Sequence, residues 1–370
     1  MKTESIDMST LSVEEAVNQL TKMYSAVIKA GLSPKVTPSV YLHGAPGSGK
    51  SEAIRELAKE LEDETGKTVN ITDVRLLLFN PIDLRGIPTA NADKTLAVWL
   101  KPQIFQMDES DNVINILFLD ELSAAPQSVQ AAAYQITLDR VVGEHKLPDN
   151  CIVIAAGNRI TDKSVAYKMP KALANRLCHM EIVASFESWK KWAIRTGINP
   201  KVIGFLSFRQ DYLNTFDASK DDLAFATPRS WEMVSNILNY VDDNIGSVMP
   251  LVTGCIGNGI ALEFQYYSEV YNNLPNIEDI FLGKTVKIPS SPDVLYALVS
   301  AMTAFAREHK KEYKMIGNSI YFAQALPADF TMLYLRSLMS IEKNYIDKLK
   351  KIPEFYEFLQ QKGSILNGAL

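Results

Sequence analysis

Apolar residues follow two alternating patterns along the first half of the chain. Short stretches rich in β-branched, aromatic and other apolar residues predict strands at 39–43, 69–72, 114–120, 151–156 and 179–183. Apolar positions three or four residues apart predict helices at 12–30, 52–64 and 127–138. Strands that alternate with helices are typical of a parallel sheet with helices on both faces. We therefore expect an α/β domain with a five-stranded parallel sheet over residues 1–185.

The second half of the chain has a different pattern. Beyond about residue 185 the strand-like runs cease, and helical spacing takes over. Thr227-Pro228 predicts a helix start, because proline is well tolerated in the first turn. The longest uncharged stretch, 244–262, is about membrane length, but glycines and Pro250 interrupt it. We interpret that stretch as a helix end followed by a turn.

The loop between the first long strand and the next helix carries the strongest chemical signal. Gly44-Ala45-Pro46-Gly47-Ser48-Gly49-Lys50-Ser51 matches the phosphate-loop pattern G-x-x-x-x-G-K-S. Glycines let backbone N–H groups approach phosphate oxygens, and the N-terminal end of the following helix favours anions. We expect Lys50 to reach the β- and γ-phosphates and Ser51 to bind Mg²⁺. With Glu52 in the first helical turn, these residues form the predicted nucleotide site.

Two carboxylates end the most apolar of the predicted strands. Asp120 and Glu121 follow the run 114–119, so they should lie at the carboxyl edge of the sheet, where ligands bind in such folds. Asp120 is expected to hold Mg²⁺ through water. Glu121 is expected to orient and deprotonate the water that attacks the γ-phosphate.

Composition narrows the class of protein without naming a function. Of the 370 residues, 47% are hydrophobic and 22% are charged, which excludes a disordered chain and predicts two or three domains. The net charge of −5 argues against a protein that mainly coats nucleic acid, although a local basic groove stays open. Three scattered cysteines and four histidines show no disulfide or zinc spacing. The polar N-terminus predicts no signal peptide, which favours a cytoplasmic protein.

These features together resemble an AAA+ ATPase over residues 10–245, in particular the MoxR branch and its dynein-related, helix-2-insert relatives. Besides the phosphate loop and Asp120-Glu121, the resemblance rests on segments 80–86, 140–144, 155–158 and 169–176. It implies a P-loop AAA+ nucleotide domain at 1–185 and an α-helical lid at 186–245. The all-helical region 246–370 has no family counterpart that we can assign.

The resemblance also implies roles for three further residues. Asn158 resembles the sensor that positions the lytic water, and Arg229 resembles the second sensor, at the start of a lid helix. Arg176 resembles the arginine finger that completes the site of the next subunit. Arg159 and Arg140 stay alternative candidates for that finger. Two departures from the family pattern are Arg159, where proline is common, and Asn175, where an acidic residue is common.

The activity that the resemblance implies is Mg²⁺-dependent ATP hydrolysis by a homo-oligomeric, hexameric ring that remodels a client protein or assists its maturation. The implied client is a protein with a von Willebrand A domain, and ATP is preferred to GTP from the family alone. A nucleic-acid motor and a nucleotide-gated assembly scaffold stay open as alternatives. The net charge counts against the motor, and Glu121 counts against the scaffold. His43 and His179 are interpreted as packed residues rather than catalysts.

Overall fold

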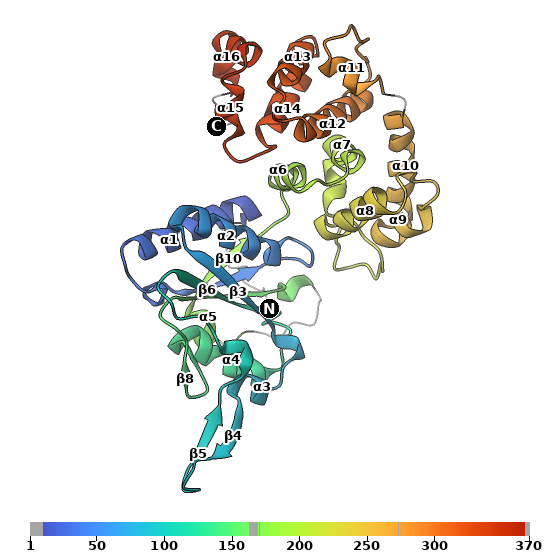
Figure 1. The fold of residues 1–370 in the computed structure, drawn as a ribbon. Coiled ribbons are helices and arrows are strands. Elements are labelled where there is room, and N and C mark those ends of the chain that lie inside the picture. The colour runs from blue at the N-terminus through green and yellow to red at the C-terminus, as the bar shows by residue number, and fades with distance from the viewer. Residues whose placement is uncertain (1–9, 163–168, 170, 273, 367–370) are drawn as a thin grey trace. The chain divides into compact units, whose positions relative to one another are not determined.

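The computed structural model describes residues 10–162, 169, 171–272 and 274–366 (Figure 1). The described chain divides into two compact units. The first contains the described residues up to Ser185 together with Phe216–Asp221. The second contains Phe186–Thr215 and the described residues from Asp222 onward, so the predicted lid and the C-terminal region share one unit.

The first unit is built on a six-stranded sheet in which all neighbouring strands are parallel. The order is β1-β10-β2-β9-β6-β3, with bounds β1 (Thr10–Leu11), β2 (Ser39–His43), β3 (Thr68–Arg75), β6 (Val113–Asp120), β9 (Cys151–Gly157) and β10 (Leu177–Ile182). The predicted α/β class is confirmed, and all five predicted strands form. The sixth, β1, is two residues long and too short to show a pattern in the sequence.

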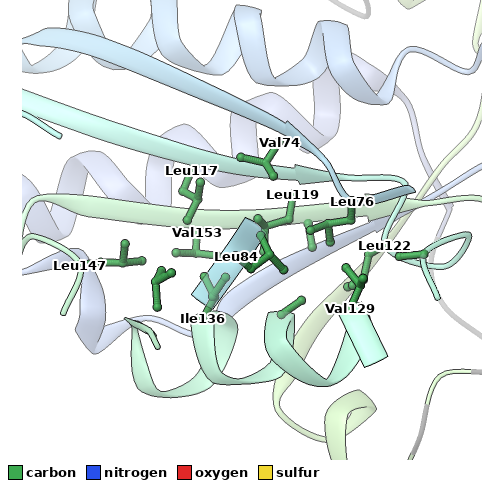
Figure 2. Packing of buried hydrophobic residues seen from close by; sticks show 14 of the residues in the cluster. Val74, Leu76, Leu84, Leu117, Leu119, Leu122, Val129, Ile136, Leu147 and Val153 are labelled. Atoms are coloured by element: carbon green, nitrogen blue, oxygen red, sulfur yellow. The ribbon is translucent and has the colours of Figure 1, made fainter. Parts of the chain in front are cut away.

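Helices cover both faces of this sheet, which explains why its central strands are apolar throughout. α1 (Val13–Lys29) and α2 (Lys50–Thr65) pack against one face. The strand residues buried on that face are Val40, Leu42, Ile114, Ile116, Phe118, Ile152, Ile154, Ala156 and Ile182. The opposite face packs on α4 (Gln127–Asp139), where Leu117, Leu119 and Val153 of the sheet lie toward Val129 and Ile136 of the helix (Figure 2). Tyr41, Cys151 and Ala155 are buried on this face as well. Successive residues of one strand thus enter opposite cores.

Two short hairpins and two short helices complete the first unit. α3 (Pro81–Arg85) leads into the antiparallel pair β4 (Ile87–Ala90) and β5 (Ala97–Leu100), which forms a separate two-stranded sheet (Figure 1). This pair lies in the part of the sequence that shows no regular pattern and was not predicted. The second hairpin, with Gly143 in its turn, consists of β7 (Val141–Val142) and β8 (His145–Lys146). α5 (Lys171–Ala174) precedes β10.

The second unit is helical throughout its described residues, as expected beyond residue 185. Its helices are α6 (Phe186–Thr196), α7 (Pro200–Phe208), α8 (Pro228–Tyr240), α9 (Met249–Ile256), α10 (Asn258–Asn272), α11 (Ile277–Phe281), α12 (Pro292–Glu308), α13 (Tyr313–Ala323), α14 (Ala328–Met339), α15 (Tyr345–Leu349) and α16 (Pro353–Leu366). Fully buried aromatic rings pack at its core, with Phe205 and Phe264 both against Trp231.

The uncharged stretch 244–262 departs from its prediction. It contains the whole of α9 and the start of α10, rather than a helix end and a turn. Gly257 separates the two helices with φ +84°, a left-handed backbone conformation that favours glycine. Within the described part of the chain, we find no helix with both the length and the apolar character needed to cross a bilayer.

Candidate nucleotide-binding site

The loop at 44–49 joins β2 to α2 in a conformation that requires its glycines. Gly47 and Gly49 have φ values of +74° and +97°, where other residues are strained. A Cβ on Gly49 would lie 2.8 Å from Cγ2 of Val13, and a Cβ on Gly44 would lie 2.7 Å from the carbonyl oxygen of Ile182. The loop backbone therefore packs too closely against α1 and β10 for side chains at these two positions, and it leaves bare backbone N–H groups of the kind that bind phosphate.

One polar atom inside this loop is buried without a hydrogen-bond partner. Ser48 is 3% exposed, and its Oγ has no partner among the described residues. A buried hydroxyl without a partner costs free energy, so a nearby anionic acceptor would relieve it. The loop thus fits a phosphate group both by its shape and by this unsatisfied donor.

Lys50 is buried at the start of α2, and its ammonium group is held by three oxygen atoms. Its Nζ donates to the carbonyl oxygens of Gly44 and Ala45 at 2.8 and 3.0 Å, and to Oδ1 of Asn158 at 3.0 Å. These three acceptors offset the free-energy cost of burying the positive charge of Lys50 beside the phosphate loop. The contact also joins the phosphate loop to the end of β9.

Asp120 lies at the end of β6, next to the first turn of α2. Ser51 Oγ donates to Asp120 Oδ2 at 3.3 Å, and the Glu121 backbone N–H donates to Asp120 Oδ1 at 2.8 Å. A hydroxyl and a carboxylate are the oxygen ligands that Mg²⁺ accepts, so this pair fits the predicted metal site. Among the described residues there is no cluster of three or more His, Cys, Asp or Glu side chains suited to another metal.

Glu121 turns the chain away from the sheet in an unusual conformation. Its φ is +57°, a left-handed value that is rare for a residue other than glycine. The next backbone N–H, that of Leu122, donates to the carbonyl oxygen of Ala156 on β9 at 2.9 Å. Such local strain is typical of functional sites, where the surrounding structure holds it. The role of Glu121 as general base stays a prediction.

Asn158 follows β9, which lies between β2 and β6 in the sheet. Adjacent parallel strands end at the same edge, and this places Asn158, Asp120 and the phosphate loop together. The backbone carbonyl of Asn158 accepts from Ser123 Oγ at 3.2 Å. Gly157 must be glycine, because a Cβ there would lie 2.1 Å from Tyr41 Oη. The sequence did not indicate that Ser123 and Tyr41 brace this strand end, since neither belongs to a motif.

The three candidate arginines have different environments. Arg140 is 6% exposed, and its Nη2 donates to the carbonyl oxygen of Thr37, so it lies in the interior. Burial lowers the pKa of its guanidinium. Arg159 forms ion pairs with Asp162 and Glu181, both at 2.9 Å. Arg176 is exposed in the turn between α5 and β10. Pro170, in the same motif, lies outside the described residues.

Arg229 lies in the second unit, in the first turn of α8. Thr227 caps that helix as predicted: its side chain accepts from the Ser230 backbone N–H at 3.1 Å, and Pro228 occupies the first helical position. The Arg229 side chain is exposed. Its contact with the γ-phosphate stays a prediction.

Comparison with known proteins gives one family match. Residues 39–179 match the model of the ATPase family associated with various cellular activities (AAA), which is less than half of the chain. Among curated proteins, none matches.

Solved structures give weak likenesses. A candidate ATPase from Cytophaga hutchinsonii has 15% identity and a TM-score of 0.33, over 88% of this chain and 94% of that one. RuvB from Thermotoga maritima has 15% identity and a TM-score of 0.35, over 80% of this chain and 86% of that one. Hsp104 has 16% identity and a TM-score of 0.40, over 65% of this chain and 46% of that one. At these scores and identities, none of the three bears on the function of this chain.

The family match spans the strands and loops that carry the site. It begins at the first residue of β2 and ends within β10, so it includes the phosphate loop, the acidic pair and Asn158. The family match and the P-loop fold coincide over residues 39–179, so the segment that carries the site is similar to ATPases of the AAA type.

Proposed function

We propose that this chain is a MoxR-like, Mg²⁺-dependent ATPase that works in a hexameric ring and remodels a client protein. The observation that carries the proposal is the convergence of Lys50, Ser51, Asp120 and Asn158 at one sheet edge, through contacts of 3.0 to 3.3 Å. A buried lysine, a hydroxyl beside a carboxylate, and a neutral amide are the groups that phosphoryl transfer from a nucleotide requires.

Each of these side chains has a separate task in the proposed reaction. The loop N–H groups and Lys50 bind the phosphate oxygens and offset their charge. Ser51 and Asp120 would hold Mg²⁺, which supplies further charge neutralisation at the phosphates. Glu121 orients the attacking water and accepts its proton, while the amide of Asn158 positions that water without competing for the proton.

The environments of the arginines support the proposed ring. A finger must project from its own subunit to reach the nucleotide of a neighbour. Arg140 is buried and Arg159 is held by two carboxylates, whereas Arg176 is exposed. The geometry therefore favours Arg176 over its two rivals, and Arg229 is proposed to sense the γ-phosphate from the lid.

The proposed client is a protein with a von Willebrand A domain, in keeping with the resemblance to the MoxR branch. The mild negative charge of the chain favours a protein client over a nucleic-acid track. The β4–β5 hairpin offers exposed apolar side chains, including Ile87, Leu96 and Leu100, which suit contact with a protein.

Mixed rings test the proposal. Arg176→Ala subunits keep an intact nucleotide site, and Lys50→Ala subunits keep an intact finger. Each variant alone should hydrolyse ATP at least about a hundredfold more slowly than the wild type. Their mixture should regain part of the activity, because some interfaces pair an intact site with an intact finger. Recovery at no mixing ratio, with both variants folded and assembled, would contradict an Arg176 that acts on the neighbouring subunit.

A further inference from the structure

Two histidines form a hydrogen-bonded bridge beside the nucleotide site. His43 ends β2, and its Nε2 lies 2.7 Å from Nδ1 of His179 on the neighbouring strand β10. The Nε2 of His179 lies 2.7 Å from the backbone carbonyl oxygen of Ala174, the last residue of α5. Both imidazoles are half-buried, and neither has a role in the chemistry described above.

The partners fix the direction of both hydrogen bonds. A carbonyl oxygen only accepts, so the Nε2 of His179 must carry its hydrogen. A neutral His179 then has a bare Nδ1 that accepts, and the Nε2 of His43 must be the donor. Burial, with smaller contributions from His179 and Lys50, lowers the pKa of His43 to about 4, so this ring is neutral near pH 7. When both rings are neutral, the bridge therefore has a single arrangement of hydrogens, in which each ring carries its hydrogen on Nε2.

A bridging metal ion does not explain this pair. Imidazole nitrogens bind zinc at about 2.0–2.1 Å, so two of them on one ion lie more than about 3 Å apart in a tetrahedral site. The two nitrogens here are 2.7 Å apart, which is the distance of a direct hydrogen bond.

The bridge connects two segments that the proposed mechanism uses. His43 directly precedes Gly44, the first residue of the phosphate loop. Ala174 stands two residues before Arg176, and its carbonyl is among the last of a four-residue helix, which leaves it without a helical partner. The His179 N–H thus satisfies this carbonyl and fixes the turn that carries Arg176 relative to the end of β2.

We propose that His43 and His179 are positioning residues that hold Arg176 in register with the phosphate loop of its own subunit, and so present it to the neighbouring nucleotide site. This inference rests on the proposed function, since it requires that Arg176 acts on the next subunit. It predicts that a defect in the bridge behaves as a defect in the finger, not as a defect in nucleotide binding.

The direct test compares His43→Leu with His43→Gln in the full chain. Leucine removes the donor to His179, whereas the glutamine amide reaches a similar place and can donate. We expect His43→Leu to lower kcat for ATP by about fivefold or more with KM changed less than about twofold, and His43→Gln to recover most of the loss. An unchanged kcat in His43→Leu would overturn the proposal, as would a glutamine variant as slow as the leucine variant.

Mixed rings then locate the defect. His43→Leu subunits mixed with Lys50→Ala subunits should regain activity, because the intact finger of the second variant serves the intact site of the first. If Arg176→Ala recovers in such mixtures and His43→Leu does not, the histidines serve their own phosphate loop and the positioning role is wrong. If Arg176→Ala does not recover either, it is the proposed ring mechanism that fails.

NMR spectroscopy tests the hydrogen bonds of the bridge independently of ATPase activity. Long-range ¹H–¹⁵N NMR spectra of the chain with labelled histidine, assigned by single substitutions of the four histidines, report which ring nitrogen carries hydrogen. We expect both His43 and His179 to be protonated at Nε2 near pH 7. A His179 protonated only at Nδ1 would contradict the bridge.

Discussion

At the scale of single residues, the site depends on which oxygen atoms hold the Lys50 ammonium group. The lysine is bound by two loop carbonyls and by the Asn158 amide oxygen. The two carbonyls belong to the phosphate loop itself, so the lysine stays in place when the amide is removed. Binding and hydrolysis should therefore respond differently to changes at position 158.

Asn158→Ala tests that difference. We expect the hydrolysis rate to fall by about 10²-fold, because the attacking water loses a fixed partner. ATP affinity should change less than about threefold, since Lys50 and the loop N–H groups remain. Single-turnover hydrolysis and equilibrium nucleotide binding measure the two effects separately. A variant that loses ATP binding but hydrolyses bound ATP normally would show that Asn158 serves the loop rather than the water.

His43 gives a pH dependence of stability at the same scale. Its pKa falls from 6.5 to about 4 on folding, mainly through burial. The folded state thus binds fewer protons than the unfolded state between these values, and the free energy of unfolding decreases as pH drops through this window. From pH 7 to pH 5 this group should account for a loss of about 2 kcal/mol.

Urea unfolding of the wild type and of His43→Phe at both pH values measures this contribution. The variant should lose less stability on acidification than the wild type does. An equal loss of unfolding free energy in the wild type and in His43→Phe between pH 7 and pH 5 would show that His43 is not buried in its neutral form.

At the scale of elements, the sheet explains both the fold and the place of the site. The sequence predicted the five long strands from their apolar and β-branched residues, most clearly in β6 and β9, which are buried on both faces. It also predicted a helix at 12–30, and in α1 a capping box forms between Ser12 and Glu15. It could not predict β4 and β5, where residues such as Ile87 and Leu100 are exposed and follow no buried pattern. The His43–His179 bridge joins strands more than 100 residues apart, which no local pattern reveals.

Two isoleucines that pair across neighbouring strands allow the contribution of core burial to stability to be measured. Ile116 on the inner strand β6 pairs with Ile71 on the edge strand β3. Ile116 is fully buried, whereas Ile71 is 39% exposed. Ile116→Ala should lower the free energy of unfolding by about 2–5 kcal/mol, and Ile71→Ala by less than half as much. Equal losses in urea unfolding experiments would contradict the sheet order described above.

At the scale of the whole molecule, the two-unit chain is proposed to function only in a ring. The phosphate loop and acidic pair could be predicted from sequence because each is contiguous and has a fixed spacing. For the arginine finger, the resemblance favoured Arg176 but left Arg140 and Arg159 open, because burial and ion pairing depend on the three-dimensional structure. The burial of Arg140 and the ion pairs of Arg159 support the proposal that Arg176 is the finger, and that role stays a prediction.

Net charge provides a prediction about the whole molecule. A chain with a formal charge of −5 has little electrostatic attraction to a nucleic-acid backbone. Duplex DNA should change the ATP hydrolysis rate by less than about twofold at any salt concentration between about 50 and 200 mM. A DNA-dependent ATPase assayed in parallel serves as the control. Strong stimulation that disappears as salt rises would favour the nucleic-acid motor over the protein-remodelling ATPase.

The measurement that tests the central claim most directly is ATP turnover by Glu121→Gln, with nucleotide binding measured on the same protein. The substitution keeps the size of the side chain and removes its basicity. We predict that ATP still binds with an affinity within about threefold of the wild type, while hydrolysis falls by about 10²-fold or more. A Glu121→Gln protein that hydrolyses ATP at the wild-type rate would contradict the mechanism assigned to this site.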